Sequence, residues 1–265
     1  MTLLDGGVLR PRQTACTGSG TLEYVLRRRE GGPTLVLING AGVGLKGWSA
    51  LFPGIESLGT VFAYNRLGIG GSDRPRSRQS GASIVAALRE LLAHASVAPP
   101  YVLVGHSLGG LYANLFARSH PQEVRACLLL EATHPKDREA LREHENQLLK
   151  ALSNLLERPQ ERFRDNVHSE LKWVDETAAQ IDAAGPFPAI PLTVVTGGRA
   201  PPRWLVPQEA LAAKRRHQQE LARLSPMGEL LVAQRSGHFP QSSEPELVLQ
   251  ALQRLVERAT TSGAV

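Results

Sequence analysis

The sequence predicts an α/β protein with a mainly parallel central sheet flanked by helices and a helical cap insertion. Three observations predict this class. Short apolar runs bounded by Gly, Pro or Asn recur along the 265 residues, helical patterns separate several of these runs, and residues 135–188 contain no clear strand. Strands that alternate with helices favour a parallel sheet whose two faces are both covered.

Six runs rich in β-branched residues or leucine have the length and the continuous apolar character of buried strands. They occupy residues 35–38, 61–64, 101–104, 125–130, 192–195 and 230–232. Amphipathic helical patterns cover residues 82–95, 111–119, 208–224 and 245–259. A chain of 265 residues is long enough for one large hydrophobic core, so we expect one α/β domain.

The segment 135–188 departs from this alternation. Its leucines recur at helical spacing among many charged residues: Leu141, Leu148, Leu149, Leu152, Leu155 and Leu156. This pattern predicts amphipathic helix, and the proline-rich residues 185–191 would return the chain to the sheet. We therefore expect an α/β core formed by residues 1–134 and 189–265, with 135–188 as a helical cap, or lid, over one edge of the sheet.

Composition limits the classes of partner. The formal net charge is +5, but the basic residues fall in short scattered clusters and only 5% of all residues are aromatic. Nucleic-acid-binding proteins gather a basic face with interleaved aromatics, so we expect no nucleic-acid partner. Cys16 and Cys127 make no disulfide framework, and no segment approaches the ~20 apolar residues that cross a bilayer. These features favour a cytoplasmic protein without a membrane span and leave its oligomeric state open.

A strand, a sharp turn and a helix follow one another at residues 101–121, YVLVGHSLGGLYANLFARSHP. The turn has the pattern G-x-S-x-G and is centred on Ser107. A serine hydroxyl is a weak nucleophile until a base removes its proton. This turn lifts the hydroxyl off the sheet on a corner so tight that Gly105 and Gly109 must be glycine, and the following helix adds N–H groups and a positive dipole end. We therefore predict that Ser107 is a catalytic nucleophile.

With this motif the chain resembles the α/β-hydrolase superfamily, and the resemblance extends over most of its length. Three further segments match in the expected order: VLINGAGVG at 36–44, VFAYNRLGIGGSDRP at 61–75 and AQRSGHFPQSSEPELV at 233–248. The first is similar to the family's oxyanion loop, with Asn39 where a histidine is common, and the second has Asn65 in place of the usual aspartate. The resemblance implies the fold and a Ser-His-acid catalytic plan that needs no cofactor, and it leaves the substrate open.

The resemblance also implies that His238 is the base. His238 follows a predicted strand and precedes a helix, which would put it at the same sheet edge as Ser107. The alternative is a solvated loop histidine. We expect His106 to pack beside the nucleophile. Five other histidines lack the paired spacing of metal ligands, so no metal site is expected: His94, His120, His144, His168 and His217.

The acid is not where many family members carry it. In those members an aspartate follows the seventh strand, but the corresponding loop here, TVVTGGRAPPRW at 193–204, contains no carboxylate. Glu209 is the next carboxylate downstream. It comes after three prolines, at the start of a predicted helix, and fits poorly.

Some related lipases carry the acid after the sixth strand, which here ends at Glu131. A helix from about residue 108 to 120 descends ~18 Å, and the strand 125–130 climbs back ~20 Å. Glu131 therefore returns to roughly the level of Ser107. We predict that Glu131 orients His238 and stabilises the imidazolium; the alternative is that it only anchors its loop. His134 either competes for Glu131 or lines a pocket.

Residues 42–47, GVGLKG, formally match the dinucleotide-binding pattern G-x-G-x-x-G. That interpretation requires an acidic residue at the end of the next strand to hold a ribose. The strand ends in Asn65, and no carboxylate occurs between Glu56 and Asp73, so we reject a nucleotide cofactor. The glycines suit an oxyanion hole, in which the Ala41 and Leu108 N–H groups face a carbonyl oxygen that becomes negative.

The sequence thus predicts a serine hydrolase that cleaves a carboxylic ester of a small or medium-sized molecule through an acyl-enzyme. Three alternatives stay open: a C–C bond or amide hydrolase with the same triad, a cofactor-free haloperoxidase-type enzyme, and a non-catalytic ligand-binding protein. Aromatic residues in or near the cap are candidate pocket walls, although aromatics are more often plain core: Trp48, Trp173, Phe187 and Trp204.

Overall fold

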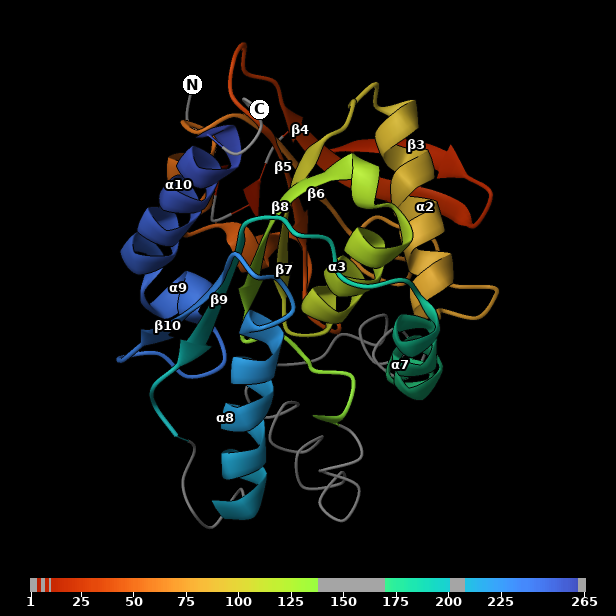
Figure 1. The fold of residues 1–265 in the computed structure, drawn as a ribbon. Coiled ribbons are helices and arrows are strands. Elements are labelled where there is room, and N and C mark those ends of the chain that lie inside the picture. Colours follow the sequence, from red (N-terminus) through yellow and green to blue (C-terminus); the bar gives the residue numbers. More distant parts are fainter. Residues whose placement is uncertain (1–3, 6–7, 10, 138–169, 201–207, 262–265) are drawn as a thin grey trace.

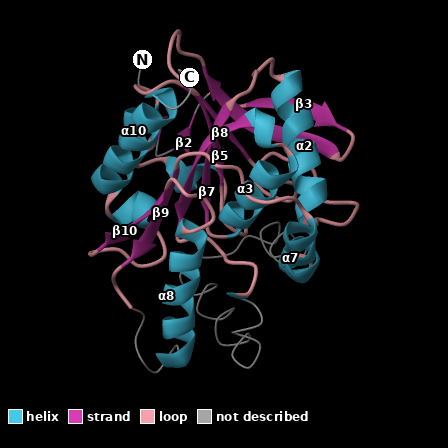
Figure 2. Cartoon of the chain, viewed as in Figure 1, coloured by secondary structure: helices cyan, strands magenta, loops and turns pink. Residues whose placement is uncertain are grey.

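An eight-stranded sheet runs through the centre of the protein, with helices on both of its faces (Figures 1 and 2). The structure, a computed structural model, describes residues 4–5, 8–9, 11–137, 170–200 and 208–261. The order across the sheet is β10-β9-β8-β7-β5-β6-β4-β3. These strands are β3 (Gln13–Thr17), β4 (Gly20–Arg27), β5 (Thr34–Ile38), β6 (Thr60–Tyr64), β7 (Tyr101–His106), β8 (Val124–Leu130), β9 (Leu192–Gly197) and β10 (Gly228–Ala233). A separate antiparallel ladder pairs β1 (Leu4–Asp5) with β2 (Val8–Leu9).

The strands from β10 to β6 are parallel to their neighbours, whereas β4 and β3 add an antiparallel hairpin at one edge. The predicted mainly parallel sheet is therefore confirmed. The register pairs Ile38 with Gly105 and His106 with Leu130. Because β5, β7 and β8 end at the same level, the loops that follow them meet at one edge of the sheet, where parallel α/β sheets bind their ligands.

The six predicted runs correspond to β5 through β10, and the strands β3 and β4 were not predicted. β3 is an edge strand in which most side chains are exposed, so it lacks a continuous apolar run. β4 carries Glu23 in its buried part, where the carboxylate accepts hydrogen bonds from the side chain of Asn65 and the N–H of Gly71. These polar residues interrupt the apolar pattern by which strands are predicted, although the buried carboxylate of Glu23 has hydrogen-bond partners in the folded protein.

Helices of different parts of the chain cover the two faces (Figure 1). The hydrophobic cluster on one face includes residues of α2 (Gly81–His94), α3 (Leu108–Ser119), α7 (Val174–Ala183) and α8 (Gln208–Ala222). The cluster on the other face includes η1 (Leu45–Trp48), α1 (Phe52–Ile55) and α10 (Pro245–Thr261), and a short helix α9 (Pro240–Ser243) precedes α10. Successive residues of β7 alternate between the two clusters, as a strand covered on both faces requires. Among the helices that the structure describes, none is long and apolar enough to cross a membrane.

The predicted cap at 135–188 is described only in part, because residues 138–169 lie outside the described residues. Its later part includes α7, which packs on α2 and α3. Side chains of α7 satisfy the first backbone donors of α2: Thr177 Oγ1 accepts from the Gly81 N–H at 2.8 Å, and Gln180 Oε1 accepts from the Ala82 N–H at 2.9 Å. The N-terminal N–H groups of a helix have no partner within it, so α7 is anchored on α2 through these bonds.

Two valine substitutions test how the sheet is stabilised. Val104 lies in β7 and is 0% exposed, whereas Val232 in β10 is 40% exposed. We expect Val104→Ala to lower the free energy of unfolding by about 2 kcal/mol, since two buried methyl groups are lost and a cavity remains. The matched change Val232→Ala should stay within about 0.5 kcal/mol of the wild type. Urea denaturation measures both; equal effects would contradict this account of the core.

Candidate active site

Ser107 stands on the turn between β7 and α3, with φ of 51° and ψ of −121°. A positive φ is strained for a residue with a side chain and persists only where the surroundings impose it. Here the surroundings are close backbone. A Cβ on Gly105 would lie 2.7 Å from the Gly109 oxygen, and a Cβ on Gly109 would lie 2.0 Å from the Ile38 oxygen. Glycine at both positions therefore allows the turn that exposes the serine.

His238 lies in the loop between β10 and α9, and its Nε2 is 3.0 Å from Ser107 Oγ. Glu244 holds this loop from one side, since its Oε2 accepts from Ser236 Oγ at 2.6 Å and from the Arg235 N–H at 2.8 Å. His106 Nε2 lies 2.8 Å from the His238 carbonyl oxygen. The position of the imidazole is thus set by its own backbone as well as by its side-chain contacts.

His106 is a buried histidine that stays neutral. Burial, with the neighbouring His238 ring, lowers the pKa of His106 to about 3. A neutral imidazole carries one proton, and the bond to the His238 carbonyl requires that proton on Nε2. The His106 ring also packs 5.0 Å from the Phe239 ring, centroid to centroid. His106, the residue before Ser107, therefore anchors the loop that carries His238.

Glu131 leaves β8 with φ of 46° and is 3% exposed. Its Oε2 lies 3.3 Å from His238 Nδ1 and also contacts the ammonium of Lys214. Its Oε1 accepts hydrogen bonds from Thr196 Oγ1 at 2.8 Å and from the Gly197 N–H at 2.7 Å. Burial raises the pKa of the Glu131 carboxyl, but the hydrogen bond from His238 and the charge of Lys214 outweigh it and hold that pKa well below its usual range. Glu131 is therefore ionised.

The end of β9 carries no carboxylate. Instead, it donates hydrogen bonds to Glu131. The Glu131 N–H donates to the Val195 oxygen at 2.8 Å, which places the acid directly beside this strand end. Gly197 permits close approach of the histidine loop, since a Cβ there would lie 2.2 Å from the Gly237 oxygen. Thr196 and Gly197, at the end of β9, are thus hydrogen-bond donors to the Glu131 carboxylate.

The loop after β5, residues 39–44, lies against Ser107, because a Cβ on Gly40 would be 3.0 Å from Ser107 Cβ. Arg66 holds this loop by donating from its guanidinium to the Asn39 and Gly40 carbonyl oxygens, each at 2.7 Å. The Gly42 N–H donates to Glu170 Oε2 at 3.3 Å. Ala41 lies between these fixed points, and Leu108 follows Ser107 directly.

Arg66 and Glu170 form a buried ion pair, with side chains 3% and 1% exposed. Burial lowers the pKa of the Arg66 guanidinium, but the charge of Glu170 and its hydrogen bonds raise that pKa above its usual value. The Tyr112 ring lies 5.4 Å from the guanidinium carbon. Neither charge was predicted from the sequence. Arg66 stands inside the segment 61–75 that resembles the family, whereas nothing near Glu170 in the sequence indicates its role.

The predicted pocket residues lie in different surroundings. Phe187 and Trp48 are buried core residues of the two opposite hydrophobic clusters. Trp173 is half-buried, and the Arg78 guanidinium lies 5.1 Å from its ring centroid. His134 stacks on His217, with ring centroids 4.5 Å apart. Trp204 lies outside the described residues.

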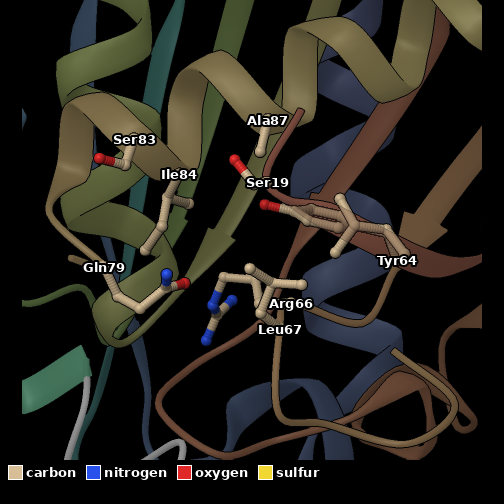
Figure 3. A pocket seen from close by; sticks show the side chains of 9 residues that line it. Ser19, Tyr64, Arg66, Leu67, Gln79, Ser83, Ile84 and Ala87 are labelled. Carbon is tan, nitrogen blue, oxygen red and sulfur yellow. The ribbon is translucent and has the colours of Figure 1, made fainter. Parts of the chain in front are cut away.

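A small crevice lies beside Arg66 between α2 and the strands β4 and β6 (Figure 3). Tyr64 and Arg66 line it on one side, and Gln79, Ile84 and Ala87 line it on the other. Its volume of about 10 Å³ is close to the space that one water molecule occupies. It is too small for an organic substrate, so we assign it no catalytic role.

Comparison with known proteins identifies the family. A family model described as the alpha/beta hydrolase fold matches residues 33–190, which is more than half of the chain. The matched segment contains Ser107 and Glu131 and ends before His238. Uncharacterized protein YqjL of Bacillus subtilis is 32% identical over 105 residues, which are 40% of this chain and 42% of YqjL. The chain thus spans less than half the length of this curated relative.

Two solved structures illustrate the similarity in fold. A putative lipase from Acinetobacter baumannii is 18% identical, with a TM-score of 0.69 over 95% of this chain and 92% of the lipase. A haloalkane dehalogenase variant from Bradyrhizobium elkanii is 17% identical, with a TM-score of 0.70 over 96% of this chain and 98% of the dehalogenase. At such low identity these structures indicate the fold and not the activity.

Substitutions at Glu170 test the buried ion pair. Glu170→Ala leaves the Arg66 charge buried without its partner, so we expect the free energy of unfolding to fall by about 3–5 kcal/mol. The double variant Arg66→Met, Glu170→Leu removes both charges and should lose less than Glu170→Ala alone. As a control, Glu176→Gln breaks the pair with Arg78, whose side chain is 72% exposed, and should cost less than about 1 kcal/mol. Denaturant unfolding of the variants measures these differences, and a similar loss in Glu176→Gln and Glu170→Ala would refute the buried role.

Proposed function

The chain belongs to the α/β-hydrolase family, and from this premise we propose that it is a serine hydrolase that cleaves carboxylic esters of small or medium-sized molecules. One observation carries the proposal: Ser107 Oγ, the two ring nitrogens of His238 and Glu131 Oε2 form one continuous series of contacts of 3.0 and 3.3 Å. A nucleophile in contact with a base that a third group orients is the signature of covalent acyl transfer.

In the proposed reaction, His238 Nε2 takes the proton of Ser107 as the serine oxygen attacks the ester carbonyl. The tetrahedral intermediate then collapses, and the imidazolium returns this proton to the departing alcohol. A water molecule next gives its proton to Nε2 and attacks the acyl-enzyme. The acid product leaves, and Ser107 recovers its proton, so His238 ends each cycle as it began and no cofactor is consumed.

Glu131 has the role of the acid in this proposal. Its carboxylate accepts a hydrogen bond from the Nδ1–H of His238, which leaves Nε2 free to take the proton of Ser107. Because Lys214 contacts the same oxygen as His238, part of the acid's charge is already compensated before the imidazolium forms. Lys214 is therefore a positioning residue that moderates how strongly Glu131 stabilises the imidazolium.

The proposed oxyanion hole consists of the Ala41 and Leu108 backbone N–H groups. Leu108 is the first residue of α3, so its N–H belongs to the positive end of the helix dipole. Arg66 and Glu170 support the other half, because they hold the backbone on both sides of Ala41. A donor that is fixed before the reaction stabilises the developing charge without reorganisation.

Residues 135–188 form the proposed cap over the core made of 1–134 and 189–265. The bonds from Thr177 and Gln180 to the start of α2 support a stable attachment of its later part. We propose that Trp173 lines the entrance from this cap, with His134, Phe187 and Trp204 as further predicted pocket residues. The proposed partner is a small ester-like molecule and the proposed location is the cytoplasm.

Covalent labelling of Ser107 and ester hydrolysis together test the proposed function. We expect a fluorophosphonate to label the wild type and Ser119→Ala, which alters an exposed serine at the end of α3, but not Ser107→Ala. Hydrolysis of p-nitrophenyl acetate should fall to the uncatalysed background in Ser107→Ala only. A wild type that is neither labelled nor active would support the ligand-binding alternative instead.

The same assay separates the bond types. With matched acyl groups, we expect the kcat/KM of the p-nitrophenyl ester to exceed that of the p-nitroanilide and of a β-diketone. A preference for the anilide or the diketone, still dependent on Ser107, would replace ester cleavage by amide or C–C bond cleavage. If the protein oxidises halide with hydrogen peroxide and Ser107→Ala retains this activity, a serine mechanism is contradicted.

Glu131→Gln tests the displaced acid. Glutamine keeps the shape but removes the charge that orients and stabilises the His238 ring, so kcat should fall by about 10⁴-fold. The matched change Glu123→Gln removes a carboxylate bound to Arg89 at the opposite end of β8 and should leave kcat within tenfold. A loss of less than tenfold in a folded Glu131→Gln protein would mean that Glu131 only anchors its loop.

A further inference from the structure

A second cluster of titratable side chains lies just beyond Glu131. His134 and Asp137 belong to the loop that follows β8, and His217 belongs to α8. One ligand atom from each side chain, a ring nitrogen or a carboxylate oxygen, lies within 4.8 Å of the other two. Both histidines are buried and Asp137 is half-buried. Among the residues that the structure describes, this is the group with the composition and spacing of a metal site.

The carboxylate and one ring are already oriented. Asp137 Oδ1 lies 2.6 Å from His217 Nδ1, and Asp137 Oδ2 accepts the His134 backbone N–H at 2.7 Å. Asp137 therefore cannot rotate without losing one of these bonds. The His134 and His217 rings stack with an angle of 18° between their planes. Since a ring nitrogen binds a metal in the plane of its ring, one of the two rings must turn out of the stack when both bind one ion.

The hydrogen bonds of His134 indicate that its lone pair is on Nδ1. Nδ1 accepts the Lys136 N–H at 3.1 Å, so the ring proton of the neutral form is on Nε2. Nε2 faces Glu220 Oε2 at 3.4 Å. A carboxylate beside one ring nitrogen and a lone pair on the other is the arrangement found in metal-bound histidines.

We propose that His134, Asp137 and His217 bind one divalent transition-metal ion of the zinc class. The ion accepts the Nδ1 lone pair of His134 in place of the Lys136 N–H. It also takes the place of the proton between His217 Nδ1 and Asp137 Oδ1. That proton leaves Nδ1 for solvent and Nε2 carries the one proton of the neutral ring, taken from solvent where it is not already there, so His217 binds as a neutral imidazole. His217 Nδ1 and Asp137 Oδ1 separate from 2.6 Å to about 3.3 Å, the spacing of tetrahedral ligands ~2.0–2.1 Å from zinc. Water completes the coordination, and Glu220 holds the His134 ring.

The chemistry of the donors selects the ion. Two imidazoles and one carboxylate suit Zn²⁺, Co²⁺ or Ni²⁺, whereas Mg²⁺ and Ca²⁺ prefer sites made of oxygen alone. Asp137 is half-buried and Glu220 is half-exposed, so the cluster lies near the surface of the protein.

The location gives the ion a structural effect near Ser107. α8 contacts the segment 131–137 at successive turns: Lys214 contacts Glu131, His217 contacts Asp137, and Gln218 donates to the Ala132 oxygen. A metal ion shared by His217 and the loop would fasten α8 to this segment. The bound ion should therefore stabilise the protein, whether or not Ser107 is a nucleophile.

Metal titration of the full chain tests the site. After dialysis against a chelator, the wild type should bind one equivalent of Zn²⁺ in isothermal titration calorimetry and show a higher Tm, and excess Mg²⁺ should not compete. His217→Gln and Asp137→Asn should weaken Zn²⁺ binding by at least about 100-fold, and Glu220→Gln by about 10-fold. His94→Gln, at the exposed end of α2, and His238→Gln should bind as the wild type does.

Circular dichroism and Tm of the metal-free variants verify that each one is folded. If His217→Gln is not folded, the nearly isosteric Asp137→Asn provides the decisive comparison. X-ray absorption of the Zn²⁺ complex should show nitrogen and oxygen ligands that include two imidazoles. The proposal is overturned if the wild type shows no saturable binding, if His217→Gln or Asp137→Asn retains full affinity, or if His238→Gln abolishes binding.

Discussion

The buried carboxylate of Glu131 is the constraint on which the arrangement around Ser107 depends. A negative charge taken out of water must be matched by donors, and Glu131 receives them from three separate parts of the chain. Thr196 and Gly197 donate from the end of β9, Lys214 contacts it from α8, and His238 contacts it from the loop after β10. These three segments are therefore held around one point. Because β7 and β8 are in register at His106 and Leu130, that point lies one strand from Ser107 at the same level.

A second buried charge network lies on the other side of β7. There Arg66 and Glu170 hold the loop after β5, which approaches Ser107 through Gly40. Buried ion pairs are costly to desolvate and contribute little net stability. Here the two charges hold backbone atoms of a loop that has no regular structure of its own. The strained turn at Ser107 thus stands between two networks of fixed charges and dipoles, and this preorganisation is what the proposed acyl transfer requires.

The predictable part of the fold and of the site rests on local pattern. The six parallel strands are continuous apolar runs, and the turn at Ser107 needs glycine at two defined positions, so both are visible in a short window of sequence. His238 could be placed because it follows a recognisable strand. The hairpin of β3 and β4 could not, since its exposed edge and the buried Glu23 break the pattern. Lys214, Glu170 and Asp137 were missed for a related reason, because a charged residue on an amphipathic helix or in a loop looks like solvated surface.

The sequence by itself determined the class of sheet, the position of the serine turn and the absence of a carboxylate from residues 193–204. Each of these depends only on residues that are close together in the sequence. Only the tertiary structure decided which side chains meet. Lys214 reaches Glu131 across 83 residues, Glu170 reaches Arg66 across 104, and Asp137 reaches His217 across 80. Such pairs follow from the strand order and from the side of the sheet that each helix covers. The burial that makes a charge or an imidazole chemically useful exists only once those elements have packed together.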